Sequence, residues 1–319
     1  MTKKRMGCFL LIGVLVLFLV SIVIGPIGQA LFNLPLPEWL KVPKPHVELP
    51  AEIIVPIGHF GGQEFGITNT LLTTWLTMIV LLLIGVLVMR RSKVIPSRFQ
   101  GLMESAFEWL YNFCKEVAGE KNGRKFFPLI TTIVLFVLFN GWLSLLPGFG
   151  SIQAHTSEGE VALLRGANTD VNTPLALAFI SFAFIWGNGI RTLGWGFFKK
   201  FFNIGRFLRG WGKIFTGKVK GGLGDLFFGF IDGAVGFIEL ISEFFRIISL
   251  TFRLFGNMMG GEILVFMMMF LVFVTPIIIP YGLELLFSLI QALIFGFLTL
   301  VFATIAATSH EGEGHGAHE

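Results

Sequence analysis

Long, nearly uncharged apolar runs are the feature that most limits what this chain can fold into. The segments CFLLIGVLVLFLVSIVIG (8–25) and LLTTWLTMIVLLLIGVLVM (71–89) are about as long as the ~20 residues that an α-helix needs to cross the hydrocarbon core of a bilayer. Of the 319 residues, 54% are hydrophobic and only 14% are charged, which excludes a large water-soluble domain. The sequence therefore predicts an all-α polytopic membrane protein.

The chain is expected to contain about six membrane helices. Residues 1–30 have a basic start and an apolar stretch, which we interpret as a retained membrane helix, with a cleaved signal peptide as the alternative. The Pro-rich segment 31–68 is expected to be external, the membrane domain to cover 69–307, and 308–319 to form a His-rich cytoplasmic tail. Within the membrane domain, helical spans are predicted at 69–89, 127–147, 173–190, 226–274 and 277–307.

The distribution of basic residues orients these spans. Of the 24 Lys and Arg, 19 fall at the start of the chain and in the loops 90–126 and 191–225, whereas Lys41, Lys44 and Arg165 fall on the other side. Lys and Arg are concentrated in short cytoplasmic loops of membrane proteins. We therefore expect both termini in the cytoplasm and a location in the cell (inner) membrane.

The basic loops favour lipid over nucleic acid as a partner. Residues 95–120 are predicted to form an amphipathic interfacial helix, and the loop 191–225 mixes aromatic and basic residues in a way typical of segments that lie on anionic headgroups. Cys8 and Cys114 have no partner at metal-ligand spacing, so neither a disulfide nor a metal site is expected. The tail histidines are interpreted as part of a solvated terminus, and no cofactor is expected.

The segment 226–274 is too long for an upright membrane helix. It contains no proline, and a helix of 49 residues would be roughly 70 Å long against a hydrocarbon core of about 30 Å. Because 277–307 is also too long, we predict a pair of strongly tilted helices joined at Thr275 and Pro276. The alternative is two upright spans broken at Gly256–Gly261, which would place the C-terminus outside.

These last two segments contain ionisable side chains, although exposure of one charge to lipid costs about 3 kcal/mol. Several polar residues are separated by three, four or seven positions, which places them along one side of a helix as a polar track. The track consists of Glu239, Ser242, Glu243, Arg246, Ser249, Arg253 and Asn257, and the last segment repeats the spacing with Glu284, Ser288 and Gln291. These groups must face one another, water or a partner.

The two arginines of the track differ in their surroundings. Arg246 lies three residues from Glu243, so a structural salt bridge is as good an interpretation as a functional role. Arg253 has no acid three or four positions away, and a guanidinium does not lose its charge in proteins. We therefore expect another chain to supply its carboxylate. Gly256 and Gly260 indicate either helix packing or close approach of that partner's helices.

Two segments resemble subunit a of the F-type ATP synthase. They are RLFGNMMGGEIL (253–264) and LIQALIFGFLTLVF (289–302), with weaker support from NGWLSLLPGF (140–149) and NTDVNTPLALAF (168–179). The resemblance covers about 69–307. It implies the proton-translocating stator of a rotary motor, with two aqueous half-channels and no nucleotide site of its own. The implied partners are a rotor ring of small hairpin subunits, each with one membrane carboxylate, the membrane helices of a peripheral stalk, and lipid.

The resemblance also implies roles for single residues. Arg253 would be the essential stator arginine, with Gln291 close to it, while Asn257 and Glu262 would line the outer half-channel and Glu239 the cytoplasmic one. The expected proton-translocation residues are Arg253, Asn257, Glu262, Glu284, Gln291, Glu239 and Ser249.

One position departs from a pattern that many relatives share. Where they pair a histidine of the last helix with the glutamate of the fifth, this chain has Glu284 with Glu262. We therefore expect two acids to share the outer pathway, one protonated as a donor and one ionised as an acceptor. The spacing between Asn140 and Pro147 differs by one residue from the usual spacing in the family that the sequence resembles. Asn140 is therefore assigned no role.

Two other classes of protein remain as alternatives. In a self-contained secondary transporter, Arg253 would bind an anionic substrate, but the repeated halves typical of such proteins do not occur in the sequence. A purely structural membrane scaffold would leave Arg253 unexplained.

Overall fold

The computed structural model describes residues 51–60, 63–91, 97–146, 149, 152–156, 159–194, 196–201, 219–271 and 278–307, together with scattered positions between 12 and 20. The predictions for the first membrane helix, for the joint at Thr275 and Pro276 and for the tail 308–319 therefore lie largely or wholly outside the described residues. The chain divides into two compact units. Unit 1 consists of Met1–Ser92, Val134–Thr173 and Leu254–Leu293, and unit 2 of Lys93–Ile133, Pro174–Arg253 and Ile294–Glu319.

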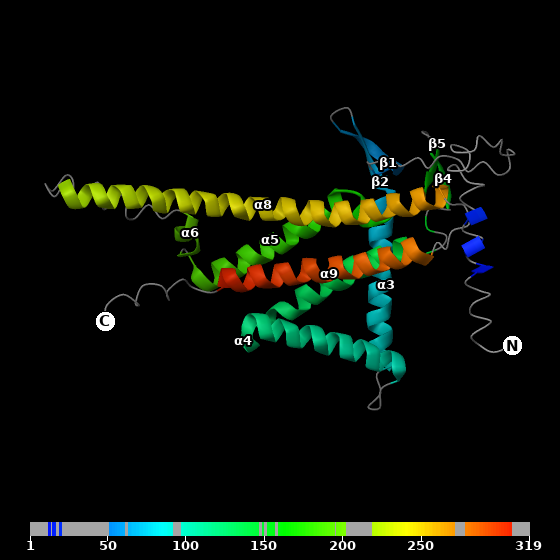
Figure 1. The fold of residues 1–319 in the computed structure, drawn as a ribbon, viewed down its shortest axis with the longest axis horizontal. Helices are drawn as coiled ribbons and strands as arrows, with labels where there is room; N and C mark the ends of the chain where they lie inside the picture. Colours follow the sequence, from blue (N-terminus) through cyan, green and yellow to red (C-terminus); the bar gives the residue numbers. More distant parts are fainter. Residues whose placement is uncertain are drawn as a thin grey trace. The chain divides into compact units, whose positions relative to one another are not determined.

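Helices make up most of the described chain (Figure 1). The elements are β1 (Ile53–Phe60), β2 (Gln63–Thr68), α3 (Asn69–Arg91), α4 (Arg98–Ser144), β4 (Gln153–Thr156), β5 (Gly159–Ala162), η2 (Ala167–Thr169), α5 (Asn172–Leu193), α6 (Gly196–Phe201), α8 (Val219–Leu271) and α9 (Ile278–Ala307). Among the described residues, five helices are long and apolar enough to cross a membrane: α3, α4, α5, α8 and α9. The predicted polytopic helical fold is confirmed, whereas the two short β-hairpins were not predicted.

Helix α8 decides between the two interpretations of the long fifth segment. It runs without a break for 53 residues and is roughly 80 Å long, more than twice the ~30 Å of the hydrocarbon core. Such a helix cannot stand upright in a membrane. The alternative of two spans broken at Gly256–Gly261 is wrong, because the helix continues through these glycines without a positive φ. In Figure 1, α3 runs crosswise to the stretches of α8 and α9 that belong to its own unit.

Helix α4 combines two predicted elements. Its two helical segments meet at Gly119, where φ is 76° and ψ is 165°, a backbone conformation that favours glycine. The first segment matches the helix predicted at 95–120, and its interfacial position stays a prediction. In unit 2 this segment contacts α9, where the rings of Phe113 and Phe297 stack with centroids 3.9 Å apart.

The two hairpins of unit 1 are tied to the start of α3. Strand β1 pairs antiparallel with β2, and β4 with β5. The side chain of Asn69, which is fully buried, donates hydrogen bonds to the Glu52 carboxylate (3.0 Å) and to the Ala162 carbonyl (3.3 Å). The Thr68 hydroxyl accepts a hydrogen bond from the Leu71 amide (3.3 Å), as an N-cap residue does. These contacts anchor both hairpins to one end of the helix.

Small residues let three helices approach one another in unit 1. A Cβ atom on Gly141 of α4 would lie 2.5 Å from the Ser288 hydroxyl of α9 and 3.0 Å from the Met258 methyl of α8. Beside it, the Trp142 indole donates a hydrogen bond to the Leu285 carbonyl (3.2 Å). Close helix packing around glycine is typical of membrane proteins, and here it brings together the elements that form the site.

Candidate functional site

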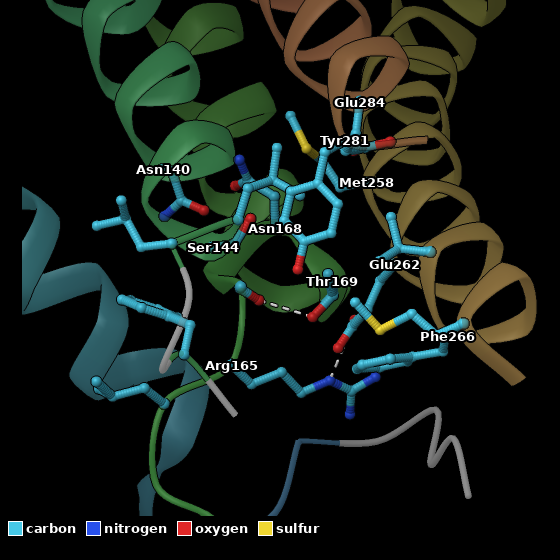
Figure 2. Close-up of a pocket in the computed structure, with 17 residues that line it drawn as sticks. Asn140, Ser144, Arg165, Asn168, Thr169, Met258, Glu262, Phe266, Tyr281 and Glu284 are labelled. Atoms are coloured by element: carbon cyan, nitrogen blue, oxygen red, sulfur yellow. Dashed lines mark hydrogen bonds and ion pairs between the residues drawn. The ribbon is translucent and has the colours of Figure 1, made fainter. Parts of the chain in front are cut away.

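A cavity of about 400 Å³ gathers polar side chains within unit 1 (Figure 2). Its walls come from the end of α4, the segment before α5, the second half of α8 and the start of α9. The polar residues that line it are Asn140, Ser144, Arg165, Asn168, Thr169, Glu262, Tyr281 and Glu284. The two acids that were expected to share one pathway, Glu262 and Glu284, therefore line the same cavity.

Glu262 forms an ion pair with Arg165. The Arg165 Nε lies 3.5 Å from Glu262 Oε2, and this arginine is only 9% exposed. Its Nη2 is also 3.5 Å from the Met259 sulfur. Removing one partner of a buried ion pair leaves an uncompensated charge, so the two residues depend on each other. The sequence analysis assigned Arg165 to an outer loop and did not include it in the site. A signal was present, because Arg165 is the only Lys or Arg between Lys125 and Arg191.

Glu284 has different surroundings, although it lines the same cavity. It is 4% exposed, and its Oε2 has no hydrogen-bond partner within the described part of the chain. Its carboxylate lies against Gly261 of α8, where a Cβ atom would overlap with it. The two acids are therefore not equivalent: one has an arginine partner, and the other faces the cavity with an oxygen unoccupied.

Two buried amides of the cavity wall also lack partners among the described residues. They are the Asn140 Nδ2 and both polar atoms of the Asn168 side chain. Buried polar groups are nearly always hydrogen-bonded to protein or to ordered water, and a cavity of this size has room for water. The sequence analysis assigned Asn140 no role, whereas the structure places it in the cavity wall.

Two further residues of the predicted site do not line this cavity: Asn257, expected on the outer half-channel, and Gln291, expected close to Arg253. The Asn257 amide donates a hydrogen bond to the Phe287 carbonyl of α9 (3.5 Å). Gln291 is 4% exposed, and its Nε2 has no hydrogen-bond partner in the described residues. Both residues belong to unit 1, and the Asn257 hydrogen bond joins α8 to α9.

Arg253 is exposed and has no carboxylate partner within the described chain. Its Nη2 lies 3.5 Å from the Ser249 hydroxyl. Arg253 and Glu262 are nine residues apart, about two and a half turns, so they point to opposite sides of α8. The exposed side that carries Arg253 also contains Gly256 and Gly260, where an added Cβ atom would meet nothing within 4 Å. The arrangement fits the expectation that the counter-ion comes from another chain.

A second cavity, of about 370 Å³, lies within unit 2. Glu239, expected on the cytoplasmic half-channel, lines it together with Glu243, Arg246 and Phe302. The Arg246 Nη1 lies 2.6 Å from Glu243 Oε2, and its guanidinium stacks over the Phe302 ring at 3.6 Å from the centroid. The salt bridge between Glu243 and Arg246 that the sequence offered is thus present in the structure.

The fold and the two cavities define a helical membrane protein whose long tilted helix presents an exposed arginine. A family model described as "ATP synthase A chain" matches residues 71–304. The chain is 33% identical over 247 residues to "ATP synthase subunit a" of Gloeobacter violaceus, covering 76% of this chain and 85% of that protein. It is 32% identical over 237 residues to the protein of the same name in Helicobacter pylori strain Shi470, covering 74% of this chain and 88% of that protein. It is also 32% identical over 238 residues to the protein of the same name in Helicobacter acinonychis, with the same two coverages.

The chain belongs to the ATP synthase A chain family, the family of the proton-translocating membrane stator subunit. Both the length of the matched region and the shared identity support this assignment, since the family model spans all five long helices from within α3 to near the end of α9.

Proposed function

We propose that this chain carries protons through two separate aqueous half-channels and that Arg253 faces the membrane carboxylates of a rotating ring. The observation that carries the proposal is a permanently charged guanidinium on the exposed side of α8, with no carboxylate near it in the described chain. A single such charge in lipid costs about 3 kcal/mol or more. A ring carboxylate would remove this cost and explain why the charge is there.

The outer half-channel would use the cavity of unit 1. Its two acids and unpartnered amides provide proton acceptors and sites for water in an otherwise apolar region. The inner half-channel would use the cavity of unit 2, which Glu239 lines. Neither cavity alone needs to cross the membrane, because the ring carries each proton from one half-channel to the other.

Arg253 would couple proton movement to rotation through its charge. A carboxyl in lipid is neutral, because ionising it there is costly, but an opposite charge within about 4–6 Å favours the ionised form. The proton must then leave before the carboxylate passes the arginine. The same positive charge repels protons and blocks a direct path between the half-channels. Each charge that crosses gains about 2.3 kcal/mol per 100 mV, which the motor converts into rotation.

Several finer assignments belong to this proposal. The partners would be a ring of small hairpin subunits, the membrane helices of a peripheral stalk and lipid. The chain itself would be non-catalytic, with ATP chemistry carried out by other subunits. It would lie in the cell (inner) membrane with both termini in the cytoplasm, as its basic loops indicate.

Purification in a mild detergent tests the proposal against its alternative. A tagged chain should bring down ring subunits and the catalytic head in fixed proportion. A chain that purifies alone and binds a small anion in an Arg253-dependent manner would contradict the stator function and support a self-contained transporter.

A further inference from the structure

The cavity of unit 1 contains two acids, and the structure gives only one of them a cationic partner. Glu262 lies 3.5 Å from the Arg165 guanidinium, and the partner comes from a segment 97 residues away in sequence. Glu284 lies on another helix, is almost fully buried, and keeps one carboxylate oxygen without a hydrogen bond in the described chain. This asymmetry is a property of the packing, since both residues are glutamates in one cavity.

The ion pair limits what Glu262 can do. Protonation of Glu262 would take a carboxylate away from a buried guanidinium, and breaking a buried pair in this way is strongly unfavourable. Glu284 has no such restraint. Its unoccupied oxygen can take a proton from water in the cavity and release it again without breaking a contact that the structure shows.

The other groups around the two acids do not change this division. The charged or titratable residues that line the cavity are Arg165 from the segment before η2, Glu262 from α8, and Tyr281 and Glu284 from α9. The end of α4 contributes Asn140 and Ser144, which carry no charge. The cavity therefore holds two carboxyl groups and a single guanidinium, and that guanidinium is paired with Glu262.

We propose that Arg165 is a positioning residue of the outer half-channel: it holds Glu262 as a fixed ionised group, so that protons exchange at Glu284 through water bound by Asn140 and Asn168. In the exchange, a hydronium ion in the cavity gives its proton to the Glu284 carboxylate, and the resulting acid passes the proton on and becomes a carboxylate again. The inference rests on the proposed function of this cavity and assigns different roles to its two acids.

Passive proton flux tests this division in membrane vesicles from which the soluble catalytic head has been removed. Flux is driven by an imposed potassium diffusion potential and recorded with a pH dye. The pH is varied on the side of the membrane to which the outer half-channel opens. Arg165→Gln should lower the flux about tenfold and shift its pH profile, because Glu262 loses the positive charge that keeps it ionised and then titrates as well. Arg165→Lys should largely restore the profile of the unchanged protein, because it returns a positive charge to the pair.

The double variant separates a positioning role from a structural one. If Arg165 acts through Glu262, then Arg165→Gln should add little further loss in a Glu262→Gln background. Arg191→Gln is the matched control, since Arg191 is exposed at the end of α5 and lines neither cavity; it should leave both flux and profile unchanged. Assembly is checked in each variant by co-purification with the ring.

Two results would overturn the inference and leave the proposed function intact: an unshifted pH profile in assembled Arg165→Gln, or full additivity with Glu262→Gln. Unchanged flux in Glu284→Gln would also overturn it, because no exchange group would remain to be positioned. The proposed function fails separately, if an assembled Arg253→Ala complex still couples proton flow to ATP synthesis.

Discussion

Arg246 and Arg253 lie two turns apart on one side of α8, yet the structure surrounds them differently. Arg246 contacts Glu243 at 2.6 Å and stacks over Phe302. Arg253 is exposed, and the contact that the structure gives its guanidinium is the Ser249 hydroxyl at 3.5 Å. Both charges lie in a helix that is largely apolar outside its polar track.

The difference shows how the same residue type can serve the fold or a partner. The charge of Arg246 is neutralised within its own helix, so its contribution is to the packing of unit 2. The charge of Arg253 is not neutralised in the described chain, so its energetic cost is offset only when a partner arrives. An arginine of the second kind is where a functional contact is expected.

The largest expected effect comes from exchanging each arginine for lysine. Arg253→Lys should reduce proton-driven ATP synthesis by at least about tenfold, because an ammonium can lose its proton on desolvation and lacks the planar, multidentate guanidinium. Arg246→Lys should retain most of the activity, since a lysine can still pair with Glu243. Synthesis is measured in vesicles energised by an imposed proton gradient. Equal losses in the two variants would remove the distinction between the arginines.

A smaller loss is expected from the acids of the unit 1 cavity. Glu284→Gln should slow ATP synthesis more than Glu262→Gln, because Glu284 is the proposed exchange group, whereas Glu262 supplies only a fixed charge. The double variant should lose less than the product of the two single effects, since both residues serve one path. Rates equal to that of the unchanged protein in both single variants would show that the outer pathway does not use this cavity.

The smallest effect is expected from labelling the C-terminal tail. In a chain with Cys8 and Cys114 replaced by Ser, a single cysteine introduced at 310–319 should leave ATP synthesis unchanged. It should react with a membrane-impermeant reagent only from the cytoplasmic side. The predicted six crossings, one each by α8 and α9 among them, return the chain to the side on which it began. Reaction from outside would contradict the predicted topology, on which the placement of both half-channels depends.

The parts of the fold that sequence could predict are those with local causes. Apolar length predicted the five helices seen in the described chain, and a proline-free stretch predicted that α8 is too long to stand upright. The Glu243–Arg246 pair follows from a spacing of three residues, which places two side chains on one helix face.

The site was only partly predictable, because its contacts join distant segments. The acids Glu262 and Glu284 were expected to act together, and the structure places both in one cavity. The Arg165–Glu262 pair spans 97 residues, and nothing in either local sequence specifies it. Asn140 and Asn168 were missed for the same reason: their unpartnered amides become visible only when α4 and the segment before α5 close the cavity.

The most direct test of the central claim compares Arg253→Ala with Arg246→Ala in the same assay. Each variant complex is purified, checked for ring and head subunits, and placed in vesicles in which ATP synthesis and passive proton leak are recorded together. The account predicts that assembled Arg253→Ala makes no ATP under an imposed gradient and conducts protons without coupling, whereas assembled Arg246→Ala retains coupled synthesis. Coupled synthesis near the rate of the unchanged protein in assembled Arg253→Ala would contradict it.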